Sequence, residues 1–249
     1  MNAIRYVNTV TKVLMDKVWY SLFNSSTLFQ HVQRTYSEES YYTSLYKLLW
    51  NDPVNIIDGL YLGNAFNAAD YEWLKDRKIK VIVNATSCVS NYFEASSKEG
   101  GTSEFLYHRY DTEDLSSGSL SDHYESFCQV VEDTRVKNER VLVHCFAGKS
   151  RSAALVLYYM SKRLHEHSFN ADEVDSLRIV DDEFVLLSDS VNDNFNKQLS
   201  ADEIVTRAMR YLKSKCSNIN INTVFVEEIK LKLRDMFEEN DGEKVVDVC

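Results

Sequence analysis

The sequence predicts an α/β fold with a central, mostly parallel sheet flanked by helices. The main observation is an alternation between residues 56 and 162, where short apolar runs typical of strands alternate with segments whose apolar residues recur every three or four positions. Such alternation favours parallel strands joined by helical crossovers. The second observation is composition: the 249 residues are 44% hydrophobic and 27% charged, as is usual for a globular chain.

The first half of this region contains three predicted strands. They span residues 57–62, 79–85 and 105–109, and the second reads IKVIVNA, as a buried strand would. A helix is expected over 67–75, between the first two strands. The polar, glycine-containing stretch 87–103 is expected to be a loop.

The second half continues the pattern. Ser121 is expected to cap a helix that carries the apolar residues Tyr124, Phe127, Val130 and Val131. A short apolar strand, RVLVH at 140–144, runs into CFAGKSRS, and a helix rich in alanine and leucine follows. Further on, Ser200 and Glu203 form a capping box that predicts another helix, and a last helix follows Asn222.

We expect three parts along the chain. Residues 1–52 form an N-terminal helical extension, 53–240 a compact domain that begins at the single proline, and 241–249 a C-terminal tail. Within the domain, about 164–200 reads as an acidic insertion with nine acidic and two basic residues. This insertion is either a solvated, partly disordered excursion or a partner-binding or regulatory element.

The N-terminal extension carries an apolar stripe at helical spacing. Its members are Ile4, Val7, Val10, Leu14, Val18 and Leu22. The stripe would pack on the body of the protein or on another copy of the chain, giving a homodimer or a partner-docking helix. The alternative is docking on a membrane surface, without stable insertion.

Charge and cysteine usage narrow the class of protein. The net charge of −10 argues against nucleic-acid binding through a broad basic surface. The five cysteines form no CxxC pair, which fits a reducing compartment. Charged residues interrupt the apolar positions near the N-terminus, and no run approaches the roughly 18 apolar residues of a membrane span. We therefore expect a cytoplasmic or nuclear protein.

The segment 144–152, HCFAGKSRS, has the form of a phosphate-binding loop between a strand and a helix. Backbone N–H groups in such a loop, together with the N-terminal end of the following helix, attract a dianion. The positive electrostatic potential of these groups also favours the thiolate form of a cysteine over the thiol, so Cys145 would be a nucleophile at neutral pH. Arg151 lies where a guanidinium can bind two phosphoryl oxygens at once. A lone cysteine at a strand end is usually a small buried hydrophobe, but HCxxGxxR arises by chance on the order of once in ten thousand such chains.

The other residues of the loop have supporting roles. Gly148 supplies backbone freedom at the turn, and the Ser152 hydroxyl could stabilise the leaving thiolate in a second chemical step. His144 is expected to orient the loop through hydrogen bonds rather than to transfer protons. The residues expected to surround a bound phosphate are Phe146, Ala147, Gly148, Lys149, Ser150 and Arg151.

On these residues the sequence resembles the dual-specificity phosphatases of the cysteine-based protein tyrosine phosphatase superfamily. The likeness extends beyond the segment VHCFAGKSRSAAL. The family's opening strand–helix–strand block is similar to IIDGLYLGNAFNAADYEWLKDRKIKVIVNAT. Its acid loop is similar to YDTEDL, and its closing motif is similar to SNININTVF. It covers about 53–162 and 199–238, and its main local departure is Ile221 in place of a proline.

The resemblance implies a protein tyrosine phosphatase-like fold and a catalytic domain over 53–240 that uses no metal and no cofactor. It implies hydrolysis of phosphotyrosine and phosphoserine or phosphothreonine in phosphorylated proteins through a phosphocysteine intermediate. Asp111, in YDTED, matches the family's general acid, a group needed to protonate the leaving oxygen. Asp114 is the nearby rival, expected at the edge of its loop.

Other functions remain open from the sequence. In one of them, residues 1–52 and the acidic insertion carry the main function and the phosphatase-like core is a scaffold. Two more concern the phosphate-binding loop itself. Relatives with the same loop act on phosphoinositides or RNA 5′-phosphates, although their loops are typically more basic; here Phe146 is apolar and Lys149 is basic. The second alternative is a non-catalytic phospho-binding module. Such modules typically lose the cysteine or the arginine, and both are present here.

Overall fold

The computed structural model describes residues 52–57, 59–94, 103–114, 118–169 and 199–243. Five strands form one sheet in the order β1-β2-β5-β3-β4. Their bounds are β1 Val54–Ile57, β2 Leu60–Gly63, β3 Ile79–Asn84, β4 Leu106–Arg109 and β5 Arg140–His144. Only the β1–β2 pair is antiparallel, and the other three pairs are parallel. The predicted α/β fold with a mostly parallel sheet is confirmed.

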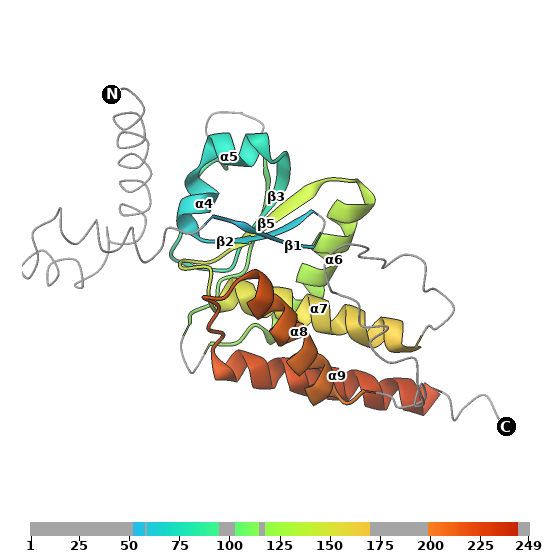
Figure 1. Cartoon of the computed structure of the whole chain (residues 1–249). Coiled ribbons are helices and arrows are strands. Elements are labelled where there is room, and N and C mark those ends of the chain that lie inside the picture. The colour runs from blue at the N-terminus through green and yellow to red at the C-terminus, as the bar shows by residue number, and fades with distance from the viewer. Residues whose placement is uncertain (1–51, 58, 95–102, 115–117, 170–198, 244–249) are drawn as a thin grey trace, which may run out of the picture.

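Helices cover both faces of the sheet (Figure 1). They are α4 Ala65–Ala69, α5 Tyr71–Asp76, α6 Tyr124–Val136, α7 Arg151–Phe169, α8 Ala201–Lys215 and α9 Thr223–Glu243. Because successive side chains of a strand point to opposite faces, the inner strands β2, β5 and β3 contribute to two cores. In β5, Val141 and Val143 join the large core under α6 to α9, whereas Leu142 joins a smaller core with residues of α4 and α5.

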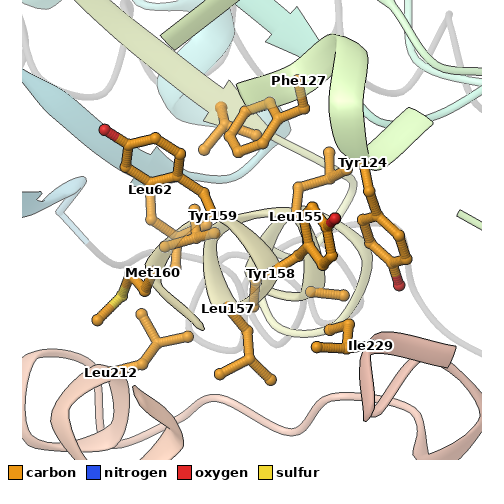
Figure 2. Packing of buried hydrophobic residues seen from close by; sticks show 14 of the residues in the cluster. Leu62, Tyr124, Phe127, Leu155, Leu157, Tyr158, Tyr159, Met160, Leu212 and Ile229 are labelled. Carbon is orange, nitrogen blue, oxygen red and sulfur yellow. The ribbon is translucent and has the colours of Figure 1, made fainter. Parts of the chain in front are cut away.

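Helix α7 lies at the centre of the larger core (Figure 2). Its first ten residues are all buried, and a helix that is apolar all round belongs in the interior. In Figure 2, Leu157 projects toward Leu212 of α8 and Ile229 of α9. On another side, the Tyr158 and Tyr124 rings stack at 4.5 Å between centroids. This packing anchors the helix that begins directly after the candidate phosphate loop.

Two expected elements are each divided in the structure. The strand expected over 57–62 is the β1–β2 hairpin, which turns at Gly59 with φ of +81°. The helix expected over 67–75 is α4 and α5, separated at Asp70, whose side chain accepts a hydrogen bond from the Trp73 N–H and caps α5. At Gly59 and at Asp70 the backbone changes direction, although the spacing of apolar residues continues on both sides.

The later helices agree with the prediction more closely. The capping box of Ser200 and Glu203 is present at the start of α8, and α9 begins directly after Asn222. The expected capping by Ser121 is wrong, since that residue starts a short 3-10 turn, Ser121–His123, ahead of α6 and caps nothing with its side chain.

Helix α7 continues to Phe169, past the point where the insertion was expected to begin. The N-terminal stripe, the rest of the acidic insertion and the end of the tail lie outside the described residues. Among the described helices, none is long and apolar enough to cross a membrane.

Candidate active site

The predicted loop lies at the edge of the sheet where the parallel strands β2, β3 and β5 end. Cys145 follows β5 directly, and α7 starts at Arg151. Two backbone hydrogen bonds attach this end of β5 to its neighbours: the Ala85 N–H donates to the His144 carbonyl at 2.8 Å, and the Ala65 N–H donates to the Phe146 carbonyl at 3.1 Å. The start of the loop is therefore held from both sides.

The loop makes its turn at Gly148, where φ is +70°. A Cβ built there would lie 2.6 Å from the Gly63 carbonyl oxygen, so no larger residue fits without displacing β2. The far side of the loop is held by the Asn220 N–H, which donates to the Lys149 carbonyl at 3.0 Å. The predicted binding residues Phe146, Ala147 and Lys149 are half-buried along this loop.

The Cys145 sulfur is the focus of two hydrogen bonds. The backbone N–H of Gly148 and the hydroxyl of Ser152 each donate to Sγ at 3.2 Å. Both donors point at a residue that is 1% exposed. They are placed to stabilise negative charge on the sulfur, and the thiolate is the nucleophilic form of a cysteine.

Arg151 is buried beside the loop, with 8% of its surface exposed. One terminal nitrogen, Nη1, donates to the Thr112 carbonyl at 3.0 Å. Its Nε is buried and donates no hydrogen bond within the described part of the chain. Oδ2 of Asp114 lies 3.8 Å from this Nε, which is close enough for an ion pair but too far for a hydrogen bond. A buried guanidinium N–H that lacks a hydrogen bond is a strong site for an anionic oxygen. The arrangement therefore suits a phosphoryl group next to the Cys145 sulfur.

His144 is fully buried, and its Nδ1 lies 3.3 Å from the Cys145 carbonyl oxygen. Burial, assisted by the positive charges of Arg109 and Arg151, lowers the pKa of His144 to about 4. The imidazole is therefore neutral near pH 7. A neutral, enclosed ring is suited to supporting the loop, as the sequence suggested, and not to exchanging protons with solvent.

The two carboxylates of the predicted acid loop differ in their contacts. Asp111 is the more exposed: 66% of its side chain is accessible, and Oδ1 lies 3.9 Å from Nη1 of Arg109. Asp114 touches the phosphate loop directly, because its Oδ1 accepts a hydrogen bond from the Ser150 hydroxyl at 2.8 Å. Asp114 was expected at the edge of the acid loop, and its hydrogen bond with Ser150 joins that loop to the phosphate loop. The role of Asp111 as the acid stays a prediction.

Sequence reasoning missed Arg109 as a support of the site. Its guanidinium donates to the carbonyls of Thr86 and Val89, both at 2.8 Å, and to Oδ1 of Asn91 at 3.2 Å. Arg109 therefore holds the loop after β3 while facing Asp111. The position of Arg109 at the end of a predicted apolar strand could have indicated this role, because a charged residue in such a place usually has a specific partner.

Within the described ranges, no group of three or more His, Cys, Asp or Glu side chains is arranged to hold a metal ion.

The chain is similar to several known proteins. The family model for the dual specificity phosphatase catalytic domain matches residues 60–204. Dual specificity protein phosphatase Mpk3 of Drosophila melanogaster is 33% identical over 173 residues, covering 67% of this chain and 38% of the relative. Protein phosphatase Slingshot homolog 3 of Rattus norvegicus is 37% identical over 108 residues, covering 43% of this chain and 15% of the relative. The chain thus spans well under half the length of these relatives.

Solved structures share the fold at low sequence identity. Human DUSP28 superposes with a TM-score of 0.52 and 19% identity, covering 74% of this chain and 97% of that one. The human tyrosine phosphatase-like serine/threonine/tyrosine-interacting protein gives a TM-score of 0.52 and 18% identity over the same shares. These likenesses concern the fold alone. Since the family model covers more than half of the sequence, the chain belongs to the family of dual specificity phosphatase catalytic domains.

Proposed function

We propose that this protein is a phosphatase that hydrolyses phosphotyrosine and phosphoserine or phosphothreonine in proteins through a phosphocysteine intermediate. The observation that carries the proposal is the placement of three groups on one loop. Cys145 Sγ accepts hydrogen bonds from Gly148 and Ser152, and at the end of the same loop the buried guanidinium of Arg151 keeps its Nε without a hydrogen bond to the described residues.

In the first step, the Cys145 thiolate attacks the phosphorus atom of the substrate. The S–P bond forms while the bond from phosphorus to the Tyr, Ser or Thr oxygen breaks. Arg151 and the loop N–H groups hold the equatorial oxygens, where charge accumulates in the transition state. The leaving oxygen takes a proton, and Asp111 is the proposed donor because it matches the general acid in the family resemblance and its side chain is exposed, with one ion pair at 3.9 Å.

In the second step, water attacks the phosphorus of the phosphocysteine. Asp111, now deprotonated, accepts a proton from this water. The S–P bond breaks, inorganic phosphate leaves, and the thiolate is restored. The Ser152 hydroxyl, 3.2 Å from Sγ, stabilises the departing sulfur.

Phosphorylated proteins are the substrate class that the chain's features support best. The relatives with more than 30% identity carry the names of protein phosphatases. Apart from Arg151, the loop carries one cation, Lys149, and it has an apolar side chain at Phe146. The net charge of −10 also disfavours polyanionic lipids and RNA.

The test is turnover by the full chain, with and without EDTA. Para-nitrophenyl phosphate and a matched pair of phosphotyrosine and phosphothreonine peptides are the substrates, and the Cys145→Ser variant is the control. Hydrolysis of all three by the wild type, and of none by the variant, is expected because a serine hydroxyl is not ionised in the loop.

Appreciable turnover by a folded Cys145→Ser variant would exclude the covalent mechanism. Wild-type protein that binds tungstate, a phosphate analogue, without hydrolysing any substrate would be a phospho-binding module. Faster turnover of a phosphoinositide or an RNA 5′-phosphate than of either peptide would overturn the proposed substrate class.

A further inference from the structure

We propose that the acidic segment 170–198 docks on the solvent-facing side of helix α8 of the same chain. The proposal goes beyond the proposed function and does not depend on it, since it concerns a surface outside the candidate active site. The cations that would hold the segment are Arg207, Arg210 and Lys213.

The solvent-facing side of α8 is basic after its first turn. Arg207, Arg210 and Lys213 are exposed and recur every three residues, so their side chains are neighbours along the helix surface. Within the part of the chain that the structure describes, no hydrogen bond or ion pair joins any of the three to another residue. The described residues therefore supply no counter-charge for this face.

The helix dipole accounts for only part of this charge. Lys213 and Lys215 lie in the last turn of α8, where cations stabilise a helix by facing the negative end of its dipole. Arg207 and Arg210 precede that turn, and the dipole effect falls off within one turn. Their placement on the same face is better explained by an anionic occupant.

A hollow of about 340 Å³ opens beside these cations. Its lining consists of Asp202, Glu203, Thr206, Arg207 and Arg210. Asp202 is already paired with two cations of α9, Lys230 at 3.2 Å and Arg234 at 2.7 Å. Arg207 and Arg210 keep a free charge at this hollow as far as the described residues go, and a guanidinium can bind a carboxylate through two parallel hydrogen bonds.

The occupant that fits this face is the segment between α7 and α8. Residues 170–198 contain eight acidic and two basic residues, which gives them a net charge of −6 out of −10 for the whole chain. The segment follows Phe169 at the end of α7 and ends three residues before Ala201, the start of α8. Fully extended, it would span roughly 100 Å, whereas α8 is only about 22 Å long. Its acidic side chains can therefore reach every cation on this face.

Attachment at both ends favours this segment over a separate molecule. A tethered segment acts at an effective concentration in the millimolar range. Exposed ion pairs are individually weak, so tethering is what allows several of them to hold the segment in place. A second copy of the chain, or another acidic protein, would instead have to approach a molecule whose net charge of −10 repels anions.

The experiment is zero-length cross-linking of the full chain with a carbodiimide, which joins a carboxylate to a lysine amine. Mass spectrometry should find Lys213 joined to acidic residues of 170–198. In an equal mixture of ¹⁴N- and ¹⁵N-labelled protein, these cross-links should join only peptides of the same label. Raising the salt concentration from about 0.1 M to about 1 M should lower their yield by about 3-fold or more, because the Debye length falls from about 10 Å to about 3 Å.

Arg207→Glu combined with Arg210→Glu is the decisive variant, because neither residue is the cross-linked lysine. The yield at Lys213 should fall by about 3-fold or more when like charges replace several exposed ion pairs. Adding Asp181→Lys and Asp182→Lys should restore the contact, seen as cross-links between positions 181–182 and positions 207–210. Lys137→Glu is the matched control: Lys137 is an exposed cation that follows α6, and its reversal should leave the yield at Lys213 unchanged.

Absence of a link from Lys213 to 170–198 in the wild type, while other lysines are cross-linked, overturns the proposal. So does a yield that is insensitive to the reversal of Arg207 and Arg210. Links between peptides of different label would make a second copy the occupant. Strong binding of a polyglutamate peptide to the wild type, but not to the double variant, would assign the face to a separate acidic partner; both outcomes also overturn the proposal. Circular dichroism establishes folding, and Arg207→Gln with Arg210→Gln decides the question if the double variant is unfolded.

Discussion

Gly148 and Gly63 are packed so closely that a Cβ on Gly148 would lie 2.6 Å from the carbonyl oxygen of Gly63. This contact joins the turn of the phosphate loop to the end of strand β2. It also fixes the position of the Gly148 N–H, which donates to the Cys145 sulfur at 3.2 Å. The loop therefore depends on a residue that has no side chain.

Gly148→Ala should distort the loop, because the φ of +70° and the overlap with Gly63 both disfavour a Cβ. We expect kcat/KM on para-nitrophenyl phosphate to fall by roughly 100-fold or more. The unfolding free energy should fall by about 1–3 kcal/mol, as in other overpacked sites.

Gly59→Ala is the matched control for this substitution. Gly59 also has a positive φ, +81°, but it lies in the β1–β2 turn at the other end of β2. Denaturant unfolding should show a loss of stability, whereas kcat/KM should stay near the wild-type value. Equal losses of activity in the two variants would contradict the special role of Gly148.

Ser152→Ala should slow the second chemical step more than the first. The hydroxyl donates to the Cys145 sulfur at 3.2 Å, and such a bond to a charged partner is worth about 1.5–3 kcal/mol. Stopped-flow measurement should show a burst of nitrophenol followed by steady turnover roughly 10- to 100-fold slower than in the wild type. Ser161→Ala, also buried and in α7, should give wild-type kinetics. If Ser152→Ala shows no burst, the hydroxyl does not act on the departing sulfur.

Asp111→Asn tests the proton donor. Since expelling a poor leaving group requires protonation, kcat/KM on a phosphopeptide should fall by roughly 10²–10⁴-fold, and the profile should lose its alkaline limb. An aryl phosphate with a good leaving group should lose much less. Should the alkaline limb persist in Asp111→Asn, the proton comes from another group and the family assignment at this residue is wrong.

His144 predicts a pH dependence of stability. Burial, together with Arg109 and Arg151, lowers its pKa to about 4 in the folded state, whereas an unfolded histidine titrates near pH 6.5. Between these values the unfolded chain binds a proton that the folded chain does not. The contribution of His144 is therefore fully present above pH 6.5 and is lost as the pH falls toward 4, by at most about 3 kcal/mol.

Denaturant unfolding at pH 7 and pH 4.5 measures this loss, and NMR titration of the His144 imidazole assigns it. His108 and His165 also have pKa values lowered by burial, so the NMR signal is needed to separate the residues. An imidazole of His144 that protonates above pH 6 in the folded protein would contradict the prediction.

The sequence by itself determined the strand, loop and helix that carry the nucleophile. RVLVH at 140–144 and the helix after it are strong local patterns, and β5 and α7 form where they were expected. The capping box of Ser200 and Glu203 was equally predictable, because its hydrogen bonds join residues three apart in the chain. Such features depend on residues close together in the chain, so they form independently of the tertiary structure.

Helix and strand boundaries were less predictable where one residue changes the backbone direction. Asp70 ends α4 and caps α5, yet the apolar pattern continues on both sides of it. Gly59 divides an apolar run into two antiparallel strands in the same way. Periodicity reports which side chains are buried, and it does not report where the chain reverses.

Only the tertiary structure decided which carboxylate touches the phosphate loop. Asp111 and Asp114 are three residues apart in one acidic loop, and no local pattern separates them. The contact of Asp114 with Ser150 spans 36 residues, and that of Ser150 with the Asn222 N–H spans 72. Such pairs depend on how the sheet and its helices bring distant loops to one edge, because hydrogen bonds select partners by distance and angle and not by separation in the sequence.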